Sequence, residues 1–206
     1  MNLYCVRHGE TEFNLAGRIQ GQSDSQLSDL GRKQCQAVAR VLAGLQVDAL
    51  IASPLRRAVQ SAEIIAETLR VTIKIEARLM EINAGIFQGH TWEEIDARFP
   101  GESRHWRSAN PDYRIPGGES RRDVMARTAA AFEEIREAGY RQALVVAHGG
   151  SLTAAFKALL QIPAERNPFS LANGSISTAN WEKDFRLLAL NETGHLNEAH
   201  SGNGEL

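Results

Sequence analysis

The chain has 206 residues, of which 43% are hydrophobic, and its formal net charge is -2 at pH 7. This length and apolar content suit a single domain with a large core, which we expect over residues 1–206. The near-neutral charge excludes the general basic surface that binding to nucleic acid or to an anionic membrane requires.

Cellular location is predicted from two further features. No apolar stretch is long enough to span a bilayer, and the N-terminus lacks the basic-then-apolar layout of a signal peptide. The two cysteines, Cys5 and Cys35, form neither a C-x-x-C motif nor a disulfide framework. We expect a cytoplasmic protein whose thiols are reduced.

The first predicted strand ends in charge. The apolar run over residues 3–6 leads directly into Arg7 and His8, and Gly9 then lets the backbone turn sharply. Open α/β sheets bind ligands at the carboxyl ends of their strands, so His8 is expected at such an edge. Residues 10–21, which include Asn14 and Gln20, are polar and irregular, and we expect them to line a site.

The next elements are a helix, a strand and a second helix. Ser28 is the predicted N-cap of a helix that Gly44 ends, and residues 48–52 predict a strand. Ser53-Pro54 predicts a helix start, with serine as cap and proline at the first helical position. This start places Arg56 and Arg57 in the first turn, where they oppose the helix dipole. A bound anion would resolve that conflict, although a solvated pair is the simpler interpretation and is preferred for Arg56.

The middle of the chain contains a candidate proton donor. Residues 71–75 alternate like an edge strand, and the glycine-rich connection over residues 79–89 follows. In it Glu81 lies between Met80 and Ile82, and a carboxyl group that these neighbours desolvate would hold a proton more readily.

A covering segment is predicted before the last helices. Residues 91–98 predict a short helix, whereas residues 99–118 contain three prolines and a Gly-Gly pair and are expected to be a loop-rich insertion that covers the active site. Trp106 in this insertion is a candidate substrate contact. Ser120 opens a capping-box helix that Gly139 closes.

The strand pattern then returns near the C-terminus. The apolar run over residues 143–147 leads into His148 and Gly149, and a helix is predicted over residues 151–160. Residues 175–181 and 185–190 predict a terminal hairpin, and residues 191–206 a partly mobile tail. A lone buried histidine is usually structural, but two histidines at matching strand ends favour a shared site.

The order of elements predicts a mainly parallel central sheet with helices on both faces. Its rim would collect the side chains of Arg7, His8, Arg57 and His148. Guanidinium groups and the N-termini of the helices after Ser53 and Gly150 are suited to bind a phosphoryl group.

These residue types permit phosphoryl transfer through histidine. A neutral imidazole at His8 is the candidate nucleophile, and His148 could donate to a phosphoryl oxygen in the transition state. Glu81 could protonate the leaving oxygen and then activate water. This cycle requires no cofactor, and no metal site is predicted because the other histidines lack metal-ligand spacing.

The motifs resemble those of the histidine phosphatase superfamily, in the branch named after cofactor-dependent phosphoglycerate mutase. The matching segments between residue 3 and about residue 160 are Val6-Arg7-His8-Gly9-Glu10-Thr11, Asn14, Gly21, Leu27-Ser28-Asp29-Leu30-Gly31, Ser53-Pro54-Leu55-Arg56-Arg57-Ala58, Glu81 and His148-Gly149. The resemblance implies a three-layer α/β/α sandwich and a phosphohistidine at His8. It also implies phosphate binding by Arg7, Arg57 and His148, with Glu81 as proton donor.

The resemblance also assigns substrate-binding positions. It places Asn14 against the phosphate and Gln20 and Gly21 in the loop beside the substrate, while Gly149 belongs to the second His-Gly motif. Two positions depart from the family pattern, namely Gln88, where glutamate is frequent, and Ser61, where threonine is usual. Both are expected outside the residues that contact phosphate, so they concern substrate preference more than chemistry.

Three functions fit these observations. The first is hydrolysis of a small phosphorylated metabolite. The second is a phosphoglycerate mutase-type transfer, although mutases of this family generally carry a longer insertion between the positions of Glu81 and His148. The third is an inactive phospholigand-binding module, which the complete residue set disfavours. No nucleic acid or membrane partner is expected, and a homodimer paired through edge strands is left open.

Overall fold

A six-stranded sheet in the order β3-β2-β4-β1-β5-β6 organises the computed structural model, which describes residues 1–197. Four neighbouring strands run parallel, namely β3 (Ile73–Ile75), β2 (Ala49–Ala52), β4 (Gln142–Ala147) and β1 (Asn2–Arg7). The antiparallel hairpin of β5 (Ile176–Trp181) and β6 (Phe185–Glu192) continues the sheet beside β1. The predicted mainly parallel sheet, its edge strand and the terminal hairpin are confirmed.

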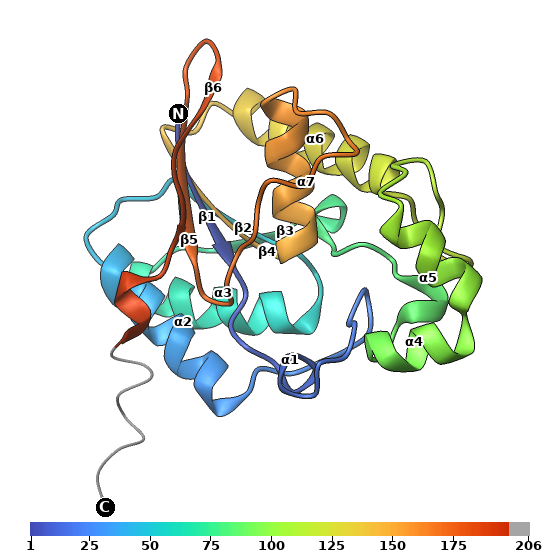
Figure 1. Ribbon diagram of the computed structural model, residues 1–206. Helices are drawn as coiled ribbons and strands as arrows, with labels where there is room; N and C mark the ends of the chain where they lie inside the picture. The colour runs from blue at the N-terminus through green and yellow to red at the C-terminus, as the bar shows by residue number, and fades with distance from the viewer. Residues whose placement is uncertain (198–206) are drawn as a thin grey trace, which may run out of the picture.

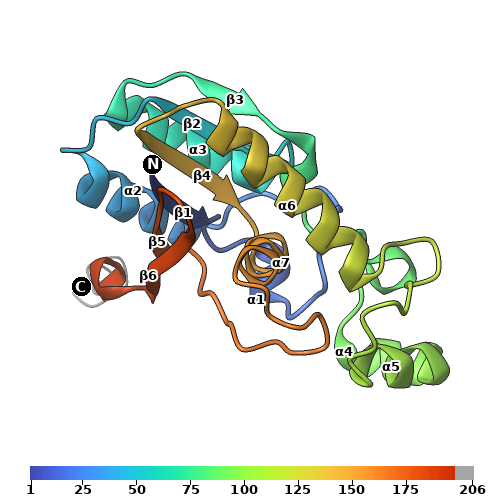
Figure 2. The same ribbon diagram turned by 90° about the horizontal axis from the view of Figure 1, so that it is seen from above.

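Helices cover both faces of the sheet (Figures 1 and 2). One face carries α2 (Asp29–Leu42) and α3 (Arg56–Leu69), and the other carries α6 (Arg121–Glu137) and α7 (Gly149–Leu159). Because side chains alternate along a strand, Leu144 and Val146 of β4 pack towards α2 and α3, while Val145 packs towards α6 and α7. The three-layer α/β/α architecture is therefore confirmed.

The remaining helices are short and lie at the rim. Helix α1 (Glu12–Leu15) follows β1, while α4 (Trp92–Arg98) and α5 (Pro100–Arg107) stand away from the sheet beyond the N-terminal end of α6 (Figure 2). Phe87, Ile95 and Ile115 form a small apolar cluster under α4 and α5. Single 3-10 turns occur at Ala77–Leu79, Gly85–Phe87 and Gly194–Leu196.

Two predictions of local structure are refined by the structure. The loop-rich segment over residues 99–118 also contains the short helix α5, in which Pro100 takes the first position, where proline is well tolerated. The helix expected at Ser53-Pro54 begins instead at Arg56, after a Leu55 cap that makes no side-chain hydrogen bond. The Ser53 hydroxyl lies only 2.7 Å from Nε2 of His148, so this serine contacts the second strand-end histidine and is not the N-cap of α3.

The first residues of the predicted C-terminal tail have regular structure. Strand β6 continues to Glu192, and a 3-10 turn follows at Gly194–Leu196. The rest of the tail, residues 198–206, lies outside the described residues. In the described part of the chain, no helix combines the length and apolarity that a membrane crossing needs.

Candidate active site

The pairing of β1 with β4 places the two strand-end histidines side by side. The parallel register matches Arg7 with Ala147, and the amide of His8 donates to the Ala147 carbonyl at 3.0 Å. The rings of His8 and His148, which follow directly, lie 5.1 Å apart between centroids and are tilted by 59°. Both side chains are buried, so the structure brings the two predicted imidazoles into one site.

The hydrogen bonds of His8 define its tautomer. Its Nδ1 lies 2.7 Å from the Gly9 carbonyl, and because a carbonyl only accepts, Nδ1 carries the proton. Nε2 is therefore unprotonated, and Nε of Arg57 donates to its lone pair at 3.3 Å. Burial, followed by the charges of Arg57 and Arg7, holds the pKa of His8 well below its usual value. His8 is thus a neutral imidazole with its basic nitrogen towards the arginine.

His148 presents its other ring nitrogen. Its Nε2 is 2.7 Å from the Ser53 hydroxyl, while its Nδ1 is buried and has no hydrogen-bond partner among the described residues. Burial and then the Arg57 charge hold the pKa of His148 well below its usual value. When the Ser53 hydroxyl donates to Nε2, the ring proton resides on Nδ1, which is then an available donor.

The structure separates the two adjacent arginines of α3. Arg57 is buried and donates to the Gly21 carbonyl at 2.7 Å and the Ser23 carbonyl at 3.1 Å. Burial lowers the pKa of Arg57 to about 10, so the guanidinium stays charged at neutral pH. Arg56 is exposed and approaches Asp24 at 3.6 Å. The solvated interpretation of Arg56 is confirmed.

Arg7 supplies a second cation, which is partly buried. One of its terminal nitrogens donates to the Leu171 carbonyl, while its Nε is buried with no hydrogen-bond partner among the described residues. Burial lowers the pKa of Arg7, and the Glu81 carboxylate opposes that shift. A β-carbon at Gly149 would lie 3.4 Å from Nε of Arg7, in ordinary van der Waals contact, so Gly149 packs directly beside the guanidinium.

Glu81 lies at the same site, beside the N-terminus of α7. Its carboxylate accepts from the amides of Ile82 and Gly150, each at 2.8 Å. A β-carbon at Gly150 would come within 2.2 Å of this carboxylate, so a larger residue there would displace the Glu81 side chain. The N-terminus of the helix after Gly150 was expected to offer free amides to an anion, and the structure shows that the Gly150 amide itself donates to Glu81. The backbone beside Glu81 is held by Arg127, which donates to the carbonyls of Met80 at 2.6 Å and Glu81 at 3.0 Å.

The predicted substrate-binding positions Asn14, in α1, and Gln20 and Gly21, in the loop after it, have different surroundings. Asn14 accepts from the amide of Thr11 at 3.1 Å and from Asn173 at 3.3 Å, which ties it to the His8 turn. Gly21 presents its carbonyl to Arg57. Gln20 is buried and accepts from the Ser25 hydroxyl at 2.6 Å, so its amide group is used within its own loop.

Two residues that hold the His8 turn were not expected in that role. Asn173 donates to the carbonyls of His8 at 3.1 Å and Gly9 at 3.3 Å. The Ser61 hydroxyl accepts from the Gly9 amide at 3.1 Å and donates to the Arg57 carbonyl at 2.7 Å. Asn173 precedes the predicted terminal hairpin, and its contact with His8 has no local sequence signal.

The assembled site suits a tetrahedral anion. The unprotonated Nε2 of His8, the guanidinium groups of Arg7 and Arg57 and the unpartnered Nδ1 of His148 lie beside the Glu81 carboxyl group. Such preorganised donors bind phosphoryl oxygens and stabilise charge that develops on them. Within residues 1–197, no group of three or more histidine, cysteine, aspartate or glutamate side chains could hold a metal ion.

The buried histidines should make stability depend on pH. The pKa of each lies lower in the folded state than in the unfolded state, so as pH falls below about 6.5 the unfolded state takes up protons first. Their stabilising effect is therefore complete above this pH and is lost as pH falls towards the folded-state pKa, at up to about 1.4 kcal/mol per pH unit for each histidine. Urea unfolding between about pH 7.5 and about pH 5 should show this loss, and the His8→Asn variant should lose less. Identical losses in both proteins would contradict the prediction.

Comparison with known proteins gives one consistent family. The model described as "Histidine phosphatase superfamily (branch 1)" matches residues 3–193. The chain is 37% identical over 188 residues to glucosyl-3-phosphoglycerate phosphatase of Mycobacterium tuberculosis, which covers 87% of this chain and 82% of the relative. It is 36% identical to the probable phosphoglycerate mutase GpmB of Escherichia coli, over 91% of this chain and 88% of the relative. The solved structure of mycobacterial glucosyl-3-phosphoglycerate phosphatase in complex with VO3 superposes with a TM-score of 0.85 at 35% identity, covering 93% of this chain and 99% of that one.

Proposed function

The chain belongs to the histidine phosphatase superfamily (branch 1), as a phosphoric monoester hydrolase, and we propose that it hydrolyses a small phosphorylated metabolite through a phosphohistidine at His8. One observation carries this proposal. The lone pair of His8 Nε2 is buried between cationic groups, with its protonation state set by the Gly9 carbonyl and by Arg57. A neutral nucleophile beside fixed positive charge is what transfer of a dianionic phosphoryl group requires.

In the first step, His8 Nε2 attacks phosphorus and the bond from phosphorus to the ester oxygen breaks. Arg7, Arg57 and the Nδ1 proton of His148 bind the phosphoryl oxygens as charge accumulates on them. Glu81, in its protonated form, gives its proton to the departing oxygen, so that an alcohol leaves.

In the second step, water attacks the phosphohistidine. The Glu81 carboxylate takes a proton from this water, the bond from nitrogen to phosphorus breaks, and orthophosphate leaves. The electron pair of that bond returns to His8 Nε2, which restores the neutral imidazole. The two amides that contact Glu81 keep its carboxyl group at the site in both steps. We further propose that the protein acts in the cytoplasm.

A mutase reaction is the second candidate, because a relative at 36% identity is named a probable phosphoglycerate mutase. The two reactions share the phosphohistidine and differ in whether water or a second hydroxyl group accepts the phosphoryl group. Incubation with 3-phosphoglycerate and, separately, with p-nitrophenyl phosphate distinguishes them. We expect both compounds to release orthophosphate, which phosphorus NMR would detect. Isomerised phosphoglycerate without orthophosphate would contradict hydrolysis.

The third candidate, an inactive phospholigand-binding module, is tested by a broader assay. We expect release of orthophosphate from at least one compound in a panel of phosphorylated acids, sugar phosphates and nucleotides. Absence of turnover over the whole panel, with binding retained, would favour the inactive module.

A further inference from the structure

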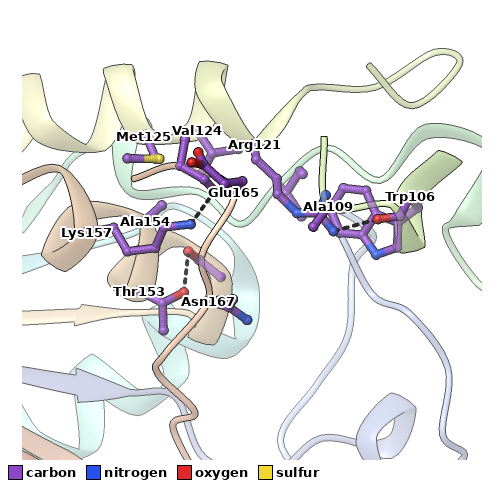
Figure 3. Close-up of a pocket in the computed structure, with 13 residues that line it drawn as sticks. Trp106, Ala109, Arg121, Val124, Met125, Thr153, Ala154, Lys157, Glu165 and Asn167 are labelled. Carbon is purple, nitrogen blue, oxygen red and sulfur yellow. Dashed lines mark hydrogen bonds between the residues drawn. The ribbon is translucent and has the colours of Figure 1, made fainter. Parts of the chain in front are cut away.

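A cavity of about 260 Å³ lies beside the active site, between α6, α7 and the loop that follows α7 (Figure 3). Ile82 and Gly150 line it, and the Gly150 amide donates to the carboxylate of Glu81. The cavity therefore adjoins the carboxylate of Glu81, the proposed proton donor. Its volume is just under the range of about 300–1,000 Å³ that is usual for small-molecule pockets, which suits a small metabolite.

One wall of the cavity is apolar and carries an ordered arginine. Trp106, Val124 and Met125 supply apolar surface. The guanidinium of Arg121 lies 3.6 Å from the centre of the Trp106 ring and donates through Nη2 to the Trp106 carbonyl at 2.9 Å. Its Nη1 is buried and has no hydrogen-bond partner among the described residues. Stacking on Trp106 therefore holds the Arg121 guanidinium in place, and its Nη1 remains available to donate to a ligand.

The opposite wall carries a second cation. Lys157 of α7 is only 5% exposed, and its ammonium donates to the Ala164 carbonyl at 2.7 Å. An ammonium has three donors, so this bond uses one of them. Burial, followed by the positive charge of Arg121, lowers the pKa of Lys157, while the exposed Glu165 opposes that shift. Two cations thus share the cavity with one carboxylate at its edge (Figure 3).

We propose that this cavity binds a second anionic group of the substrate, a carboxylate or a second phosphate, through Arg121 and Lys157. Buried like charges with unused donors are costly unless an anion is bound between them, and charge-assisted hydrogen bonds to oxygen anions are strong. The inference rests on the proposed function, because the phosphoester itself must lie at His8. It narrows the substrate class to phosphorylated metabolites that carry a further acidic group, with the carbon skeleton against Ile82 and Trp106.

Matched substrate pairs test this proposal. The compounds 3-phosphoglycerate and glycerol 1-phosphate differ by a carboxylate, and fructose 1,6-bisphosphate and fructose 6-phosphate differ by a phosphate. We expect a higher kcat/KM for the more acidic member of one of the two pairs. The pair that shows this preference identifies the second anionic group as a carboxylate or a phosphate. In the Arg121→Met variant, which keeps apolar contact with Trp106, this preference should fall about tenfold or more. Lys157→Met should lower it likewise. The matched control is Arg122→Met, because Arg122 is the next residue on α6 and pairs with Asp112 on the surface.

A preference ratio is the appropriate measurement, because it cancels differences in the amount of folded enzyme. Equal kcat/KM values within both pairs for the unaltered protein would overturn the proposal. Unchanged ratios in both the Arg121→Met and Lys157→Met variants would also overturn it. Titration calorimetry with the same compounds measures the preference in Kd without turnover. A preference in Kd in a protein that releases no orthophosphate would therefore refute the proposed function and leave the anion subsite supported.

Discussion

Replacing His8 by asparagine is expected to lower kcat for p-nitrophenyl phosphate by a factor on the order of 10⁴ or more, as loss of a nucleophile does in other enzymes. The side-chain amide of asparagine can still donate to the Gly9 carbonyl, as Nδ1 of His8 does at 2.7 Å. It has no basic nitrogen at the position of Nε2, so only the nucleophile is lost. Release of p-nitrophenol, followed at saturating substrate, measures the effect.

The control for this variant is His90→Asn. His90 is partly buried on the connection before α4, where its Nδ1 lies 3.0 Å from the Gln88 carbonyl, and it takes no part in the proposed cycle. We expect the control to keep turnover within a few-fold of the unaltered protein. Thermal unfolding of both variants separates loss of chemistry from loss of fold. A folded His8→Asn variant that retains a tenth of the original kcat would refute His8 as the nucleophile.

The Glu81→Gln variant should discriminate between leaving groups. Alkyl phosphates such as glycerol 1-phosphate require a proton on the departing oxygen, so their kcat/KM should fall by roughly 10²- to 10⁴-fold. An aryl phosphate leaves as a stabilised phenolate, so its kcat/KM should fall far less. Glutamine can still accept a hydrogen bond from Gly150, which preserves one of the two contacts of the side chain.

Because both substrates are measured on the same variant, the ratio of their kcat/KM values does not depend on the fraction of folded enzyme. An exposed carboxylate on α4, changed as Glu93→Gln, serves as the matched control and should alter neither substrate. If Glu81→Gln slowed alkyl and aryl phosphates by the same factor, Glu81 would act in binding or folding and would not be the acid.

The arrangement of the two histidines could be predicted because it depends on local signals. Each follows a short apolar run that ends in a His-Gly pair, and the carboxyl ends of parallel strands meet at one edge of a sheet. The register that pairs Arg7 with Ala147 then makes His8 and His148 direct neighbours. Local apolar periodicity and one general rule of sheet architecture were sufficient.

The separation of Arg56 from Arg57 could not be obtained from local pattern alone. Both residues occupy the first turn of α3, and helix periodicity does not say which one is covered. Arg57 is buried because the loop before α2 turns back and offers the carbonyls of Gly21 and Ser23. The resemblance to a known family selected Arg57, whereas the sequence itself left both interpretations open.

Residues that support the site from a distance were missed for a related reason. Asn173 reaches His8 across 165 positions, and Ser53 reaches His148 across 95. A short polar side chain near a turn or a helix start fits many local roles, so its pattern predicted a turn or a cap. The cavity next to Glu81 was missed likewise, because Lys157 lies within an ordinary helical pattern and meets Arg121 only in the fold.

The most direct test of the central claim is to trap the phosphorylated protein by rapid quenching with labelled substrate. We expect a phosphoryl group that is labile in acid and stable in base, located by peptide mass spectrometry on His8 and absent from the His8→Ala variant. A label on another residue, or a label that persists in His8→Ala, would contradict the proposed phosphohistidine.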